Sequence, residues 1–354
     1  MQKKISILLL VMLTVSTALL FSGVGFKIAP VTPLFREYLA DPYAPSSKFN
    51  RLTALTEESI PKNIYYVDEG QYAEIPFTHE GQKNYFNLKV GANVGLLRFE
   101  TGFFQMEAFL YGGLNTLFEF EGATDNLGFD GFYAVGGSLR LWDVVAIQGG
   151  IHHFSGHWGD EILKSTAEEN SAVNFKDMTL LEYTRDNSWI IAISIEPTKT
   201  FRFYSTVEMP QKTAWVRPAA HVPVTGTHPN KPMQEHIAGQ EGVEFEVEYP
   251  SSYRALRVQV GSEVRFPLYS LGDFFIAGDF QFHQDGKTLH LMNSYSETNP
   301  WEFTMCLGLG FEFNRGYRER KVRLESFYHY GRLPLLNFFF QRGHYVSVGV
   351  SISG

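Results

Sequence analysis

The feature of this sequence that most constrains its fold is a strict alternation of apolar residues with polar or small ones. From Phe86 to Leu96 every even position is apolar, whereas the odd positions hold asparagine, lysine and glycine. A period of two places these sets on opposite faces of a β-strand, while a helix would scatter the apolar residues around its circumference. The run is long enough for a tilted strand to cross a bilayer.

The alternation recurs along the chain, in about twelve segments between residues 85 and 353. Clear examples lie at 133–141, 189–196, 303–313 and 346–353. The chain is 44% hydrophobic, and after its N-terminus it lacks the apolar runs of about 20 residues that a helical membrane protein needs. The sequence therefore predicts an all-β fold, an antiparallel transmembrane β-barrel of about 12 strands.

The connections and the composition favour a membrane barrel over the soluble alternatives, an antiparallel sandwich or a lipocalin-like barrel. Tight turns are predicted at Trp142–Asp143 and Pro197–Lys199, whereas 158–186 and 210–241 are long and polar. Short periplasmic turns and long external loops are typical of outer-membrane barrels. The 31 phenylalanines and 18 tyrosines suit strands that face lipid and form aromatic girdles.

The N-terminal part is predicted to contain two further regions. Lys3 and Lys4 precede an apolar core and small residues, so residues 1–25 are expected to be a secretory signal peptide, with an uncleaved anchor as the alternative. Residues 26–84 hold many prolines and no sustained period, which indicates an N-terminal extension, periplasmic or plug-like. The barrel is expected at 85–354, in the bacterial outer membrane. The order of short and long connections requires one more strand before Tyr85, for which Ile75–Thr78 is the candidate.

Charge and cysteine content exclude some classes of function. The net charge is −8 without a basic block, so nucleic-acid binding is not expected. Cys306 is the single cysteine and cannot form an internal disulfide. We expect no cofactor, and the expected partners are outer-membrane lipids and small solutes that pass through the lumen.

One stretch concentrates chemically active side chains: three histidines, a serine and two carboxylates lie between His152 and Glu161. In an extended chain His153, Ser155 and His157 share one face, the face that also carries the apolar residues Val145, Ile147 and Ile151. Without a bulge this row prolongs a lipid-facing surface at the rim. A bulge at Gly149–Gly150 would instead turn the row into the lumen.

Three interpretations of this cluster compete. Ser155 can be a nucleophile with His153 or His157 as its base, oriented by Asp160 or Glu161. His153 and His157 can instead bind a metal together with one of the two carboxylates. The third interpretation is a hydrogen-bonded network that holds the long loop to the barrel.

Other polar groups are weaker candidates. Three histidines in the 210–241 loop could bind a metal, and a row of three glutamates could form a cation-selective ring. A third polar row has the ordinary interpretation of a solvated or lumenal face. These residues are His221, His228 and His236; Glu244, Glu246 and Glu248; and Asp279, Gln281 and His283.

The stretch His153–Glu161 resembles the H-x-S-S-H-x-G-D-E hallmark of an uncharacterised bacterial family, domain of unknown function 1207, with Gly156 in place of the second serine. Leu39–Pro42, which follows Pro33–Phe35, is similar to that family's opening motif. The resemblance implies a membrane location and a special rim, but no reaction. His153-Phe154-Ser155 is also similar to the H-x-S pair of outer-membrane lipid A deacylases, which would make Ser155 the nucleophile and His153 the base.

The leading functional prediction is a channel or a structural protein of the outer membrane. The alternative is a lipid or ester hydrolase of the outer membrane that uses a catalytic cluster of His153, Ser155, His157, Asp160 and Glu161.

Overall fold

A computed structural model describes residues 24–68, 71–76, 82–120, 126–169, 179–211, 216–218, 256–268, 270–284, 301–313, 321–338 and 341–352. The predicted signal peptide, the three loop histidines and the three glutamates at 244–248 therefore lie outside the described residues, except for residues 24 and 25. No helix among the described residues is long and apolar enough to cross a membrane.

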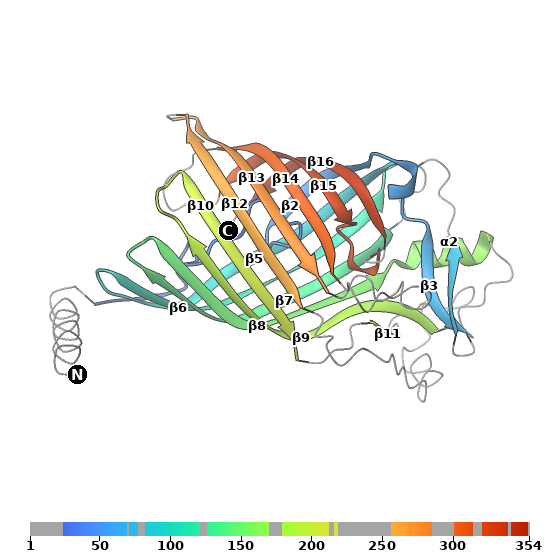
Figure 1. Cartoon of the computed structure of the whole chain (residues 1–354), viewed down its shortest axis with the longest axis horizontal. Coiled ribbons are helices and arrows are strands. Elements are labelled where there is room, and N and C mark those ends of the chain that lie inside the picture. The colour runs from blue at the N-terminus through green and yellow to red at the C-terminus, as the bar shows by residue number, and fades with distance from the viewer. Residues whose placement is uncertain are drawn as a thin grey trace.

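Twelve antiparallel strands form a closed β-barrel, as the alternation predicted (Figure 1). Each strand pairs with its neighbours in the chain, and β16 pairs with β2 to close the barrel. The strands are β2 (Ser47–Ala54), β5 (Asn84–Glu100), β6 (Phe104–Glu119), β7 (Asn126–Leu141), β8 (Val145–Trp158), β9 (Thr179–Ile195), β10 (Phe201–Pro210), β12 (Arg257–Pro267), β13 (Gly272–His283), β14 (Glu302–Phe313), β15 (Val322–Arg332) and β16 (Arg342–Ile352).

The first wall strand is split into two pieces. The short strand β1 (Gly25–Ile28) pairs with residues 97–100 of β5, and β2 pairs with residues 84–89 of the same strand. Both run antiparallel to β5, so they are successive parts of one interrupted strand. The barrel thus begins before residue 85, and the additional strand that the connections required is β2 rather than Ile75–Thr78.

The two faces of each strand differ as the alternation demands. On β15, Leu324 is 50% exposed on the outer surface, whereas Arg323 and Glu325 are buried on the lumenal side. The exposed apolar side chains recur on nearly every strand, which gives the barrel an outer surface suited to lipid. Polar and charged side chains gather inside, where they form hydrogen bonds and ion pairs with one another and with residues 29–46.

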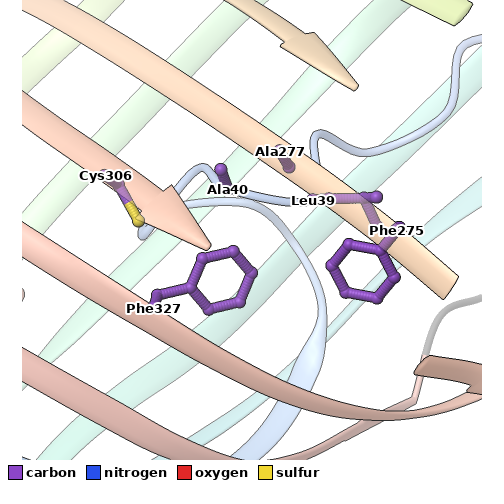
Figure 2. Packing of buried hydrophobic residues seen from close by; sticks show 6 residues of the cluster. All are labelled: Leu39, Ala40, Phe275, Ala277, Cys306 and Phe327. Atoms are coloured by element: carbon purple, nitrogen blue, oxygen red, sulfur yellow. The ribbon is translucent and has the colours of Figure 1, made fainter. Parts of the chain in front are cut away.

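The segment between β1 and β2, residues 29–46, enters the lumen and forms a plug. The Arg202 guanidinium donates to the backbone carbonyls of Arg36 and Glu37, and the Lys89 ammonium donates to those of Pro42 and Ala44. Leu39 and Ala40 pack against apolar side chains of three barrel strands (Figure 2). The plug-like role predicted for this part of the chain is therefore confirmed for residues 29–46.

The two ends of the barrel carry different connections (Figure 1). At one end the strand connections that the structure describes are tight turns, and Trp142 and Asp143 both have positive φ, 51° and 55°, as the turn predicted there requires. At the other end lie the long connections. They contain the helix α2 (Asp160–Glu169), the 3-10 turns η1 (Glu57–Ser59) and η3 (Leu336–Phe338), and the short strands β3 (Asn63–Asp68), β4 (Gln71–Pro76) and β11 (Val216–Pro218).

The connection between β15 and β16 folds inward at this long-loop end. Pro334 accepts a hydrogen bond from Asn115 of β6, at 2.6 Å, and the Leu336 amide donates to Asp130 of β7, at 3.0 Å. Phe338 packs edge-on against Trp158, the last residue of β8. The lumen therefore contains two chain segments, the plug and this inward connection.

Candidate functional site

The polar row of β8 faces outward. His152, Phe154 and Trp158 are buried on the lumenal side, while His153, Ser155 and His157 alternate with them and are partly exposed. The register with β7 runs without interruption from Val145 to Trp158, so no bulge at Gly149–Gly150 turns the row inward. The row is thus the continuation of the apolar outer surface at the long-loop end of β8.

Ser155 and His157 lie within hydrogen-bond distance. Their Oγ and Nε2 atoms are 3.3 Å apart, although residues two apart on a strand stand roughly 6 to 7 Å from each other at the backbone. The ring of Phe129, on the neighbouring strand β7, lies beside the His157 imidazole with 4.9 Å between ring centroids. This apolar neighbour covers one side of the imidazole.

His153 lies on the other side of Ser155 and has different neighbours. It stacks on Tyr133 of β7, with 5.1 Å between ring centroids, and the Tyr133 hydroxyl donates to Asn187 Oδ1 at 3.4 Å. Asn187 belongs to a bulge of β9, where the register with β8 shifts between His152 and Phe154. Tyr133 and Asn187 thus join the candidate site, and sequence reasoning missed both because only the strand register brings them next to the histidine.

Gly131 faces Ser155 directly across the β7–β8 pair. A Cβ at this position would lie 3.3 Å from Ser155 Oγ and 3.9 Å from Leu114 Cδ2, with nothing else within 4 Å. The glycine therefore leaves an open notch beside the hydroxyl, between the side chains of Phe129 and Tyr133 on the same outer face of β7. A substrate carbonyl could approach Ser155 through this notch.

The two carboxylates of the predicted cluster start the helix that follows β8. Asp160 and Glu161 form the first turn of α2 and are exposed, whereas Ile162 and Leu163 are buried. Among the described residues, no group of three or more His, Cys, Asp or Glu is gathered so that it could hold a metal ion. The metal interpretation of His153 and His157 therefore finds no support in the described part of the chain.

The polar row of β13, Asp279, Gln281 and His283, lies inside the barrel, which agrees with the predicted lumenal face. Asp279 accepts hydrogen bonds from the Tyr204 hydroxyl and from the amides of Gln259 and Gln281, all at 2.8 Å. Gln281 also donates to Asp41 of the plug, at 3.1 Å, and His283 is buried on the same face. This row contributes to holding the plug in the lumen.

Comparison with known proteins shows similarity in fold alone. The chain matches no family model and no curated protein sequence. Among solved structures it is similar to outer membrane phospholipase A from Escherichia coli, with a TM-score of 0.44 and 8% identity over 88% of this chain and 93% of that one. The calcium-bound dimer of the phospholipase from Salmonella typhi gives a TM-score of 0.43 and 9% identity, over 88% and 92% of the two chains.

Channel proteins are also among the similar structures. The NanC porin has a TM-score of 0.33 and 10% identity, over 76% of this chain and 99% of the porin. The outer membrane channel DcaP of Acinetobacter baumannii has a TM-score of 0.30 and 8% identity, over 94% and 98% of the two chains. These structures share with this chain the closed antiparallel β-barrel and nothing finer.

Proposed function

We propose that this chain is an outer-membrane hydrolase that cleaves an acyl ester of a membrane lipid, with Ser155 as the nucleophile and His157 as the general base. The observation that carries the proposal is the 3.3 Å contact between Ser155 Oγ and His157 Nε2 on the outward face of β8. A serine hydroxyl is a weak nucleophile unless an adjacent group accepts its proton. A neutral imidazole whose Nε2 carries no proton is such a group.

The residues support a two-step acyl transfer. Ser155 Oγ attacks the ester carbonyl while His157 Nε2 takes the hydroxyl proton, and the imidazolium then gives this proton to the departing alcohol oxygen. Water next attacks the acyl-serine with His157 again as base, which releases the fatty acid and restores the hydroxyl. Tyr133 and Asn187 border the site on the side of His153, where they can orient a bound headgroup.

The position of the row suits a substrate that is itself part of the membrane. The outer surface next to it is apolar, with Leu110, Leu114 and Val135 each about half exposed on β6 and β7. Long loops of outer-membrane barrels lie outside the cell, so the long-loop end of β8 meets the outer leaflet. A lipid in that leaflet would bring its acyl ester to Ser155 without leaving the bilayer.

The contents of the lumen argue against the channel that the sequence favoured. The plug crosses the interior and is bonded to the wall through Arg202, Lys89 and Glu263. The inward connection at 333–338 adds a second obstruction. Export by a signal peptide at residues 1–25 and membership of the domain of unknown function 1207 family are further parts of this proposal, supported by the sequence motifs.

The proposal is tested by lipid mass spectrometry of cells that carry the wild type, Ser155→Ala, His157→Ala or His153→Ala. We expect the wild type to release fatty acid from an envelope lipid, and both Ser155→Ala and His157→Ala to lose this activity by on the order of 10³-fold or more. His153→Ala should retain a larger share, because His157 makes the contact with Ser155. Identical lipids in cells with and without the wild-type protein would rule the hydrolase out.

A further inference from the structure

A cavity of about 70 Å³ lies between the plug and the wall of the barrel. Its lining combines aromatic side chains with the polar residues Asn93, His152, Glu208 and Arg257, and the plug contributes Tyr38 and Asp41 among others. The cavity is separate from the outward row, because His152 faces the lumen whereas Ser155 and His157 face lipid. A single water needs roughly 10 to 15 Å³, so this space can take a small molecule.

Two polar atoms in the lining have no hydrogen-bond partner among the described residues. The first is Nε2 of His152, a residue that is only 5% exposed, and the second is Oδ1 of Asn93. Nδ1 of His152 lies 3.5 Å from the Glu208 carboxylate, which favours the tautomer with the proton on Nδ1. Nε2 of His152 and Oδ1 of Asn93 are then both acceptors. Buried acceptors without a donor are costly, so the cavity is suited to a ligand that supplies N–H or O–H groups.

The charges around the cavity favour a cation. Of its charged lining residues, Arg36 is paired with Glu196 and Glu37 with Arg323. The others are Asp41, Glu208 and Arg257, and the Arg257 guanidinium lies 3.4 Å from Glu208 and 3.9 Å from Asp41. Among the described lining residues, two carboxylates share this one guanidinium, which favours a cation over an anion as the ligand.

We propose that this lumenal cavity binds a small organic ammonium ion, whose N–H groups donate to His152 Nε2 and Asn93 Oδ1 and whose positive charge complements the carboxylates of Asp41 and Glu208. The aromatic lining, from Phe35, Tyr38, Tyr43, Tyr111 and Phe154, suits the carbon-bearing end of such a ligand. Since the Asn93 amide also donates to the backbone carbonyl of Phe35, at 3.0 Å, the bound ligand would join the plug to the wall.

The test is calorimetric titration of the folded full-length chain in detergent with methylammonium chloride, at constant ionic strength. Tetramethylammonium is the matched control ligand, because it carries the same charge and no N–H group. We expect methylammonium to bind and tetramethylammonium to bind at least tenfold more weakly, and His152→Leu and Asn93→Ala each to weaken methylammonium binding about tenfold or more.

The control variant is His344→Leu, which makes the same change on the outer surface, where His344 Nδ1 lies 2.6 Å from the Tyr328 hydroxyl. It should bind methylammonium as the wild type does, and Asn93→Ala carries the test if His152→Leu does not fold. Equal affinity for the two cations, wild-type affinity in both cavity variants, or a folded wild type that binds neither cation would overturn the proposal. The last result would mean that the cavity holds only water.

Discussion

Two glycines on the same outward face of β7 meet different surroundings. A Cβ on Gly131 would lie 3.3 Å from Ser155 Oγ, closer than an ordinary contact, whereas a Cβ on Gly137 would meet only the backbone oxygen of Glu107, at 3.8 Å. Neither glycine has a positive φ, so alanine is compatible with the backbone at both positions. The difference between the two positions is therefore one of space beside the serine.

A single added methyl group at each position should therefore have different effects on activity. Gly131→Ala should lower kcat/KM for lipid ester hydrolysis by on the order of 10-fold to 100-fold, because the methyl group fills the notch and crowds the nucleophile. Gly137→Ala is the control and should remain near the wild-type rate. Measurement of fatty-acid release by the two purified variants checks this, and equal activity in both would show that substrate does not use the notch.

The plug is the element that distinguishes this barrel from an open pore. It connects β1 to β2 where the first wall strand is interrupted, opposite residues 90–96 of β5. Ser47, at the start of β2, exchanges hydrogen bonds with Gly91 there, at 3.0 and 3.3 Å. Most of its polar contacts go to buried charges of the wall, such as Arg202 and Lys89. These charges would lose partners if the plug left, so the plug stabilises the lumen as well as filling it.

Residues 29–46 can be replaced with a short segment of alternating apolar and polar residues, long enough to pair with residues 90–96 of β5. This change should complete the first wall strand and open the lumen. We expect planar-bilayer recordings to show conductance for this variant and none for the wild type. Heat-modifiable migration on gels verifies that the variant still forms a barrel. Conductance in the wild type would restore the channel interpretation. A folded variant that does not conduct would mean that the connection at 333–338 closes the lumen by itself.

At the scale of the whole molecule, the barrel has one end with tight turns and one with long connections, and this asymmetry predicts its orientation. Asp160 is exposed at the long-loop end and Lys199 is exposed in a tight turn at the other. The native Cys306 is buried, at 2% exposure, so it should contribute little background to thiol labelling.

In intact cells, a membrane-impermeant maleimide should label Asp160→Cys, because long loops of outer-membrane barrels lie outside the cell. Lys199→Cys should be labelled only after the outer membrane is permeabilised. The reverse pattern would place the Ser155 row at the inner leaflet, and it would contradict the proposed substrate.

The sequence by itself determined the properties that depend on neighbours in the chain. Alternation predicted strands, a barrel and a shared face for His153, Ser155 and His157, because successive side chains on a strand take opposite faces whatever the strand pairs with. The turn at Trp142–Asp143 is equally local. The irregular, proline-rich sequence after the predicted signal peptide likewise indicated a segment outside the regular wall, because it has no alternating pattern. That the shared face of His153, Ser155 and His157 is the outer one was decided by the uninterrupted register between β7 and β8.

Only the tertiary structure decided what lies across from each of these residues. Gly131 faces Ser155 and Asn187 lies beside His153 because of hydrogen-bond register between strands, which no single segment specifies. Strand β2 was missed because it is short and lies beside the prolines of the plug, and it joins the wall through pairing with β16, at the far end of the chain. Contacts between residues so distant in sequence are set by closure of the barrel, and closure is a property of the whole chain.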